Sequence, residues 1–106
     1  MSNNTMNNLI KIKDQYLIFR DQAKVFEKVI SKKLKEKNNS EVCLDFSQVH
    51  FISRSFADEL LEIINYFQKE KSRDIKVINQ NSLVSQLFSI VKKQKGKIKK
   101  ELSLQI

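Results

Sequence analysis

Glycine and proline are almost missing from the 106-residue sequence, which contains one glycine, Gly96, and no proline. The phosphate-binding loops of P-loop proteins and of dinucleotide-binding folds both need several glycines. These two classes of nucleotide-binding protein are therefore excluded. With the usual turn residues missing, the boundaries of helices and strands must be read from clusters of Asn, Asp and Ser.

Cysteine and histidine occur once each, as Cys43 and His50. A single cysteine cannot form an internal disulfide and is typical of proteins in the reducing cytosol. A Cys/His metal cluster is excluded for the same reason. Catalysis of the Ser-His or Cys-His type would depend on His50 alone, and no nucleophile is recognisable beside it. We therefore expect a protein that is not an enzyme and that needs no metal and no cofactor.

Long apolar runs are also absent, since none approaches the roughly 18 to 20 residues that span a bilayer. The first ten residues carry no basic side chain, which a secretory signal would need. We expect a cytoplasmic protein without membrane insertion. An apolar fraction of 41%, with seven phenylalanines, is enough for one core in a chain of this length.

Positive charge is concentrated near the C-terminus, where residues 71–106 hold nine Lys and Arg against two acids. Most of the excess lies in Lys92, Lys93, Lys95, Lys97, Lys99 and Lys100. Such a run attracts phosphate backbones, but solvated tails are often just as basic. A nucleic-acid-binding segment and a solvated tail both stay open.

Short apolar runs alternate with helical periodicity along the chain. The expected elements are strands at 9–13 and 16–19, a helix capped by Asp21, a strand at 41–46, a helix from Ser55, a strand at 75–78 and a helix capped by Asn79 or Asn81. The order β-β-α-β-α-β-α predicts a single α/β domain with about three helices and a mixed, largely parallel sheet of about four strands. The first two strands are expected to form a hairpin or to lie side by side.

The domain is expected to span 8–92, after a disordered N-terminus at 1–7. Residues 93–106 are expected to be a basic tail or, because 101–106 alternates with period two, an edge strand. The strand at 41–46 carries apolar residues on both faces, which predicts a central strand buried on both sides. In the last helix, Leu83 and Val84 are both expected to face the core.

The junction between the strand at 41–46 and the next helix resembles the signature of STAS domains, in which a strand ends in Asp and leads to a serine-containing turn that opens a helix. The match is closer to STAS-like domains of unknown function, which are related to bacterial anti-sigma factor antagonists. The matching segments are Arg20-Asp-Gln-Ala23, Leu44-Asp-Phe-Ser-Gln-Val49, Ser55-Phe-Ala-Asp-Glu-Leu60 and Ile78-Asn79. This resemblance implies a signalling module whose partner is a histidine-kinase-type ATPase or another regulatory protein.

One departure from the regulatory signature matters for function. In the anti-sigma factor antagonists the turn carries a phosphorylated serine, and Arg54 occupies that place here. The standard phosphorylation switch is therefore not carried over, which leaves Ser53 and Ser55 as candidate phosphorylation sites.

Ser55 also has a structural explanation. Ser-x-x-Asp predicts a capping box, in which the Ser55 hydroxyl accepts from the amide of Asp58 and the Asp58 carboxylate reaches back. Two interpretations stay open: a cap only, or a cap that is also a regulated or binding serine.

Three further residues are candidates for partner binding. Asp45, at the end of the strand, either contacts a partner or ties down the following loop. Arg20 and Arg54 both precede helices on the same edge of the sheet. They form either an anion-binding corner, since Arg suits phosphate and carboxylate, or separate pairs with local acids such as Asp21 and Asp58.

Two functions are compatible with these features. The first is a non-enzymatic STAS-like interaction module that binds a protein partner through residues 45–59 and Arg20. The contact residues would be Asp45, Ser53, Arg54, Ser55, Asp58 and Arg20. The second is a small nucleic-acid-associated module that uses the segment Lys92–Lys100.

Overall fold

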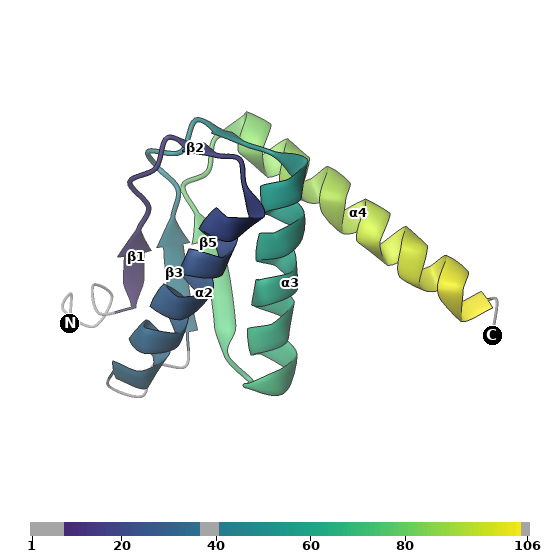
Figure 1. The fold of residues 1–106 in the computed structure, drawn as a ribbon, viewed down its shortest axis with the longest axis horizontal. Coiled ribbons are helices and arrows are strands. Elements are labelled where there is room, and N and C mark those ends of the chain that lie inside the picture. The colour runs from purple at the N-terminus through teal and green to yellow at the C-terminus, as the bar shows by residue number, and fades with distance from the viewer. Residues whose placement is uncertain (1–7, 37–40, 105–106) are drawn as a thin grey trace.

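The computed structural model describes residues 8–36 and 41–104, with side chains described as far as residue 96. Within these ranges the chain forms five strands and three helices (Figure 1). The strands are β1 (Leu9–Lys11), β2 (Tyr16–Leu17), β3 (Glu41–Asp45), β4 (Phe51–Ile52) and β5 (Asp74–Ile78), and the helices are α2 (Arg20–Lys35), α3 (Arg54–Glu70) and α4 (Ser82–Leu104). The predicted α/β class is confirmed. The segment 1–7, predicted to be disordered, lies outside the described residues.

Each strand pair in the described part of the chain is parallel. One sheet has the order β1-β3-β5, so β3 is the central strand, as predicted. Parallel neighbours need a long connection, and α2 and α3 lie in the connections that precede and follow β3. The second sheet contains only β2 and β4. The first two strands therefore do not form a hairpin, because β1 and β2 belong to different sheets.

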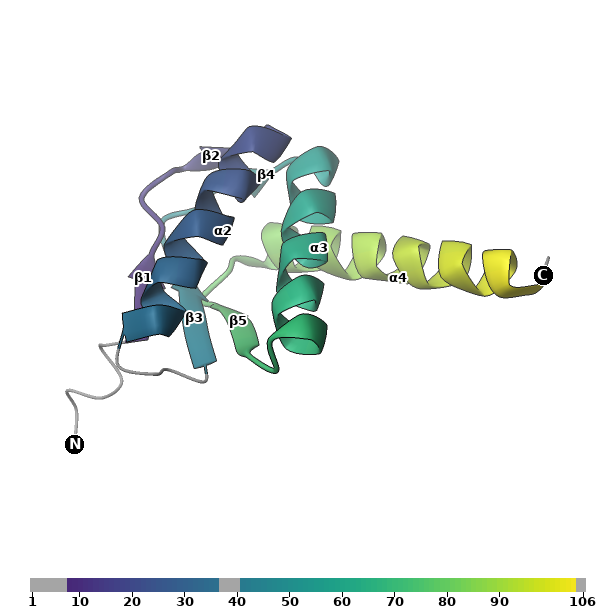
Figure 2. The same ribbon diagram turned by 60° about the horizontal axis from the view of Figure 1, so that its bottom comes forward.

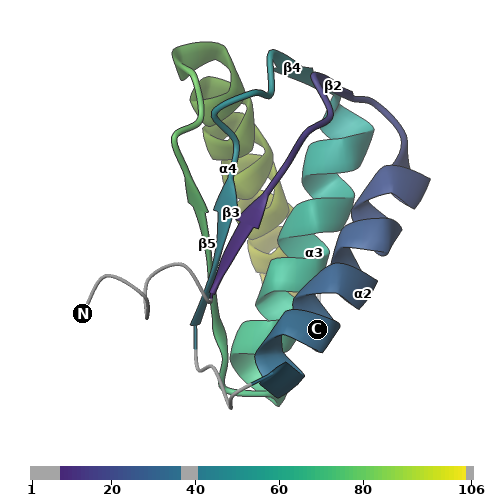
Figure 3. The same cartoon turned by 90° about the vertical axis from the view of Figure 1, so that its left-hand side faces the viewer.

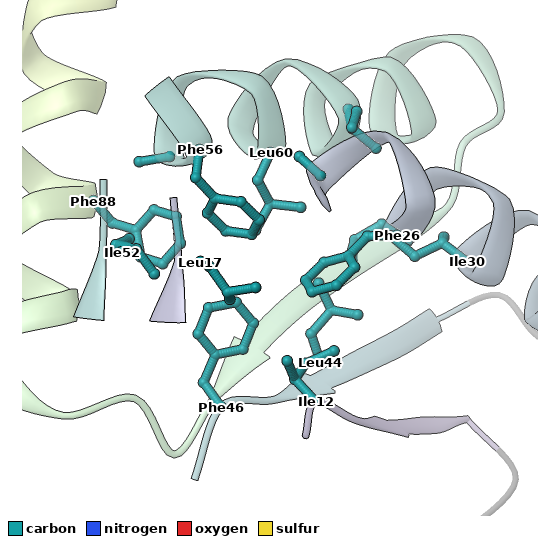
Figure 4. Packing of buried hydrophobic residues seen from close by; sticks show 14 of the residues in the cluster. Ile12, Leu17, Phe26, Ile30, Leu44, Phe46, Ile52, Phe56, Leu60 and Phe88 are labelled. Atoms are coloured by element: carbon teal, nitrogen blue, oxygen red, sulfur yellow. The ribbon is translucent and has the colours of Figure 1, made fainter. Parts of the chain in front are cut away.

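The helices α2 and α3 lie against the same face of the three-stranded sheet (Figure 3). Their apolar stripes recur at helical spacing and meet the inward side chains of β3. The largest fully buried side chains are Phe46, Phe56, Leu17, Ile30, Leu44, Ile52, Leu60, Val42 and Val84. At the centre, the rings of Phe26 and Phe56 meet edge to face, with centroids 5.6 Å apart (Figure 4). This geometry is favoured between aromatic rings, and it joins the two helices.

The opposite face of the sheet is more open than the sequence predicts. Cys43 points to this face and is only half-buried, and its neighbour on β5 is the exposed Lys76. The Lys76 ammonium lies 3.0 Å from the Glu41 carboxylate on the same face. The expected burial of β3 on both faces is therefore wrong, because Lys76 and Glu41 occupy positions that a second helical layer would have to desolvate.

The last helix, α4, is continuous through the predicted domain boundary at residue 92. Val84, Phe88 and Val91 are buried in the core, and beyond them the helix runs away from the rest of the molecule (Figure 2). The predicted edge strand at 101–106 is wrong as far as Leu104, since these residues are helical; residues 105–106 lie outside the described residues. None of the described helices is both long and apolar enough to cross a membrane.

Candidate functional site

All three helices begin at one end of the molecule, beside β2 and β4 (Figure 3). This arrangement follows from the parallel topology, because each strand of the main sheet ends where the next helix begins. We call this end the strand-end surface and define it by residues 14–20, 45–58 and 79–83. It includes Asp45, Ser53, Arg54, Ser55, Asp58 and Arg20, the side chains predicted to bind a partner.

Asp45 is a structural residue at this end. The residue is 8% exposed, and its carboxylate Oδ1 accepts from the Ser47 amide at 3.0 Å and from the Asn79 side-chain nitrogen at 3.1 Å. The bond from Asn79, followed by that from Ser47, lowers the pKa of Asp45. Asn79 has a φ of 61°, a conformation that Asn tolerates better than most residues. Asp45 thus holds the ends of β3 and β5 together. This favours the interpretation that it ties down the following loop over the one in which it contacts a partner.

Ser53, and not Ser55, is the N-cap of α3. Its hydroxyl oxygen accepts from the Phe56 amide at 3.0 Å and donates its proton to the Ile18 carbonyl. The Ser53 amide also donates to the Leu17 carbonyl at 2.9 Å. These bonds to the β2 segment keep Ser53 extended, so the helix begins at the next residue. The predicted capping box of Ser55 and Asp58 is therefore wrong.

Asp58 connects three helices instead of capping one. Its Oδ2 accepts from Arg20 Nη1 at 2.8 Å, and its Oδ1 lies 2.6 Å from Lys95 Nζ. Arg20 also contacts Glu59 at 3.1 Å, and Lys95 contacts Glu62. The hydrogen bond from Lys95 lowers the pKa of Asp58, with a smaller contribution in the same direction from Arg20. We call these five residues the acid–base cluster.

Lys95 itself is half-buried. Burial alone would lower the pKa of its ammonium, but the bonds to Asp58 and Glu62 outweigh burial and raise that pKa. Lys95 is thus committed to the acid–base cluster, which argues against its predicted role in binding nucleic acid. Lys92 and Lys93 are exposed, whereas the side chains of Lys97, Lys99 and Lys100 lie outside the described ones.

The two arginines of the predicted anion-binding corner differ in their environment. Arg20 is occupied by Asp58 and Glu59, so the structure favours the local pairs for this residue. Arg54 is exposed and has no ion pair with any residue that the structure describes. Ser55 is exposed beside it. Arg54 is therefore the charged side chain of the predicted set that stays available at the strand-end surface.

Exposed apolar side chains at the same end were not predicted. Tyr16, Phe19, Phe51 and Leu83 are 60%, 68%, 42% and 59% exposed. Leu83 was expected to face the core, but only its neighbour Val84 does so. Beside Phe51 and Leu83 lies a hollow of about 190 Å³, which Ile90 also lines. Phe51 has no periodic signal in the sequence because β4 is only two residues long.

The groups that were weighed for catalysis are dispersed. His50 lies on the loop before β4, with its ring centroid 6.2 Å from that of Tyr16. Cys43 lies on the open face of the sheet, where burial raises the pKa of its thiol. Within residues 8–36 and 41–104, no group of three or more His, Cys, Asp or Glu could hold a metal ion.

Of the two residues predicted to cap the last helix, Asn79 and Asn81, the structure selects Asn81. Its side-chain oxygen accepts from the Val84 amide at 2.8 Å, which closes the first turn of α4. Its side-chain nitrogen donates to the carbonyl oxygens of Val49 and His50 at 3.2 and 3.1 Å. Asn81 therefore ties the start of α4 to the loop that leads into β4, so that Phe51 and Leu83 lie on the same hollow.

Comparison with family models, with curated proteins and with solved structures finds no match to this chain. The resemblance to STAS-like domains stays a prediction from the four sequence segments that carry it. The strand-end surface combines exposed aromatic side chains with Arg54, an exposed arginine that has no ion pair with a described residue.

Proposed function

We propose that the protein is a cytoplasmic, non-enzymatic regulatory module of STAS-like type that binds a protein partner through the strand-end surface. The observation that supports this function best is the exposure of Tyr16, Phe19, Phe51 and Leu83 at the end that carries Arg54. Water solvates such side chains poorly, and a partner that covers them gains roughly 25 cal/mol for each Å² of apolar surface.

The composition of this surface is typical of protein interfaces. Aromatic residues and arginine are enriched in interface cores, and tyrosine and arginine often dominate the binding energy. The hollow beside Phe51 and Leu83 can receive one apolar side chain of the partner. Arg54 supplies a forked donor for a carboxylate or a phosphate next to this apolar contact.

The structure divides the predicted contact residues into two groups. Asp45, Ser53, Asp58 and Arg20 are held in internal hydrogen bonds or ion pairs, so their contribution is to shape the surface. Arg54 and Ser55 are exposed, and we assign direct contact to these two residues. By the resemblance, the partner is a histidine-kinase-type ATPase or an anti-sigma-like regulator.

A regulatory phosphate would be placed on Ser55 and not on Ser53. The Ser53 hydroxyl both accepts from Phe56 and donates to Ile18, and a phosphate there would break both bonds. Ser55 lies in the first turn of α3, where nearly two negative charges are favoured by the helix dipole and by Arg54. Mass spectrometry of protein from its native host tests this assignment, and phosphate found only on Ser53 would contradict it.

The test of partner binding compares variants with matched controls. Affinity purification from the native cytoplasm with the full chain, followed by quantitative mass spectrometry, is expected to enrich a partner. Arg54→Gln and Phe51→Ser should each weaken binding of the purified partner about tenfold or more. Lys69→Gln, an exposed position in the last turn of α3, is the control and should bind normally. Equal binding by Arg54→Gln, Phe51→Ser and Lys69→Gln would refute the proposal.

The alternative is a nucleic-acid-associated module, and the observation that favours it is the basic helix α4, which extends beyond the body of the molecule (Figure 2). Deletion should begin at residue 97 and not at residue 92, because Lys95 belongs to the acid–base cluster. If this alternative is right, a chain ending at Gly96 loses binding to duplex DNA or RNA, and binding by the full chain weakens steeply with salt. Partner binding at the strand-end surface should survive the same deletion.

A further inference from the structure

A second surface lies on the other side of α4, where the main sheet ends at β5. Because the strand order is β1-β3-β5, β5 pairs with β3 on one side and with no described strand on the other. Between its free edge and the helices α3 and α4 is a groove of about 590 Å³, within the roughly 300 to 1,000 Å³ of ligand-binding pockets. The groove does not include Phe51, Arg54 or Ser55. Of the residues that define the strand-end surface, only Gln80 lines the groove, so the side chains proposed to contact the partner lie outside it.

Backbone hydrogen-bonding groups of β5 point into this groove. The Phe46 amide donates to the Ile78 carbonyl at 2.9 Å, so Ile78 turns its backbone toward β3. In a parallel strand the direction alternates with every residue. The N–H and C=O groups of Ile75 and Val77 therefore face away from β3, and no described residue bonds to them on that side. Such groups are a template for one more strand.

The groove admits one strand but not a second sheet. Its far wall is formed by Phe88, Lys92 and Gly96, which follow one another at intervals of four residues on α4. A strand with its own sheet behind it would collide with this wall. The occupant must therefore be a single extended segment, as in recognition by strand addition.

The side chains of the groove determine what that segment carries. Leu61 and Ile64 of α3 are half-buried and line the side nearest the core, so alternate residues of the segment should be apolar. The two acids of the groove already have partners, since Glu62 contacts Lys95 and Asp74 lies 3.9 Å from Lys76.

Lys92, by contrast, is exposed and has no ion pair with a described residue. Its positive charge would be complemented by an acidic side chain on the bound strand. We propose that this groove binds an extended segment of a partner protein, with alternating apolar and acidic side chains, as an added strand on β5.

The test uses the full chain and a fluorescent hexapeptide of alternating glutamate and valine. We expect it to bind about tenfold tighter than a peptide of alternating lysine and valine, because Lys92 attracts the first and repels the second. Methylation of the peptide amides that face β5 should abolish binding. Failure of the glutamate–valine peptide to bind at millimolar concentration, or equal binding of the lysine version, would overturn the proposal.

Amide hydrogen exchange locates the added strand. Exchange at Ile75 and Val77 should slow when the peptide is bound, because their N–H groups then have acceptors. Leu9 and Lys11 are the matched control. The Cys43 amide donates to the Asn8 carbonyl, and the Ile12 amide donates to the Asp45 carbonyl. Leu9 and Lys11 must therefore face the opposite free edge of the sheet. Peptide binding without protection at Ile75 and Val77 would overturn strand addition.

Substitutions in the protein test whether the peptide binds in the groove or at a neighbouring part of the surface. Lys92→Glu should weaken the glutamate–valine peptide about fivefold, and Lys93→Glu, an exposed neighbour outside the groove, should not. Val77→Pro removes an N–H that does not bond β3, so the sheet should survive while binding is lost. If Val77→Pro does not fold, Lys92→Glu and the methylated peptide still decide the outcome.

Analytical ultracentrifugation tests whether a second copy of the chain, and not a partner protein, occupies the groove. A chain that dimerises through this groove, with dimerisation lost in Lys92→Glu, would show that a second copy fills it. That result would overturn the proposed partner segment. A chain that stays monomeric while it binds the glutamate–valine peptide supports the proposal.

Discussion

Ser53 and Ser55 show how two identical residues, two positions apart, take different roles. Each is followed three residues later by a helical residue that it could cap, and the sequence favours Ser55 because Asp58 completes a capping box. The hydrogen bonds to Leu17 and Ile18 decide in favour of Ser53. A local pattern cannot reveal such bonds, because their acceptors lie more than thirty residues away.

The first prediction follows from this difference. Ser53→Ala should lower the free energy of unfolding by about 1 to 2 kcal/mol, since it removes both the cap and the bond to Ile18. Ser55→Ala should change it by less than about 0.5 kcal/mol, as expected for an exposed side chain. Urea denaturation of both variants measures the contrast. A larger loss of unfolding free energy in Ser55→Ala would support the capping box of Ser55 and Asp58 that the sequence predicts.

Asp45 gives a second prediction at the residue scale, a dependence of stability on pH. Its pKa is lowered from the ordinary value of 3.8, so the folded state favours the carboxylate more than the unfolded state does. The resulting stabilisation is complete above pH 3.8 and is lost as the pH falls through the folded-state pKa.

Asp45→Asn keeps an oxygen that can accept from Ser47 and Asn79 but cannot titrate. Between pH 5 and pH 2 it should lose less free energy of unfolding than the wild type. Asp14→Asn, at an exposed carboxylate, is the control for general charge effects. If Asp45→Asn loses as much stability as the wild type, the carboxylate is not the group that responds.

At the scale of whole elements, sequence patterns succeeded where apolar residues recur regularly. The first helix carries apolar residues at helical spacing, namely Ala23, Phe26, Val29, Ile30 and Leu34. All of them except Val29, which is 41% exposed, are buried in α2. The patterns failed where an element is short or where a segment is compatible with both the helical and the strand period. The strand β4 has two residues and therefore shows no alternation.

The segment 101–104 alternates like a strand but also contains Glu and Leu, which favour helices. The same segment continues a helix that is already formed, so each added residue gains a hydrogen bond without a new nucleation step. An edge strand would have needed a neighbouring strand. Local alternation alone could not decide between the two.

The third prediction tests which side of α4 faces the core. Phe88→Ala should lower the free energy of unfolding by about 3 to 5 kcal/mol, because the ring is buried beside Phe46 with centroids 6.0 Å apart. Leu83→Ala should cost far less, since the side chain is 59% exposed. Thermal and chemical denaturation measure both changes. A large loss in Leu83→Ala would support the sequence-based expectation that Leu83 faces the core.

At the scale of the whole molecule, the acid–base cluster determines how the helices are joined. Arg20 of α2 and Lys95 of α4 both contact Asp58 of α3. The sequence offered Asp58 as one possible acid partner of the two arginines, but it did not show that Lys95 meets the same carboxylate. Their sequence separation explains this failure, because contacts between distant segments depend on the packing of the core and not on local spacing.

The cluster also connects the two proposed binding surfaces, because Arg20 and Asp58 belong to the strand-end surface and Glu62 and Lys95 line the groove beside β5. Leu83 and Ile90 line the hollow at the strand-end surface, whereas Phe88 and Lys92 line the groove beside β5. Both pairs belong to α4, and Lys95 attaches this helix to α3. The position of α4 therefore shapes both surfaces at once.

The fourth prediction tests this attachment. Lys95→Ala should speed amide hydrogen exchange at residues 92–96, because α4 loses its contacts with Asp58 and Glu62 beyond Val91, the last buried residue among the described side chains. Lys93→Ala, at an exposed position, is the matched control and should leave exchange unchanged.

Exchange in α2 should be insensitive to Lys95→Ala, since Arg20 keeps Asp58 and Glu59 as partners. The same variant should weaken binding of the glutamate–valine peptide, because the part of α4 that carries Lys92 and lines the groove is then held less firmly. Unchanged exchange at 92–96 would mean that Val91 and the core alone position α4. In that case a ligand on either surface would have no route through Lys95 to influence the other.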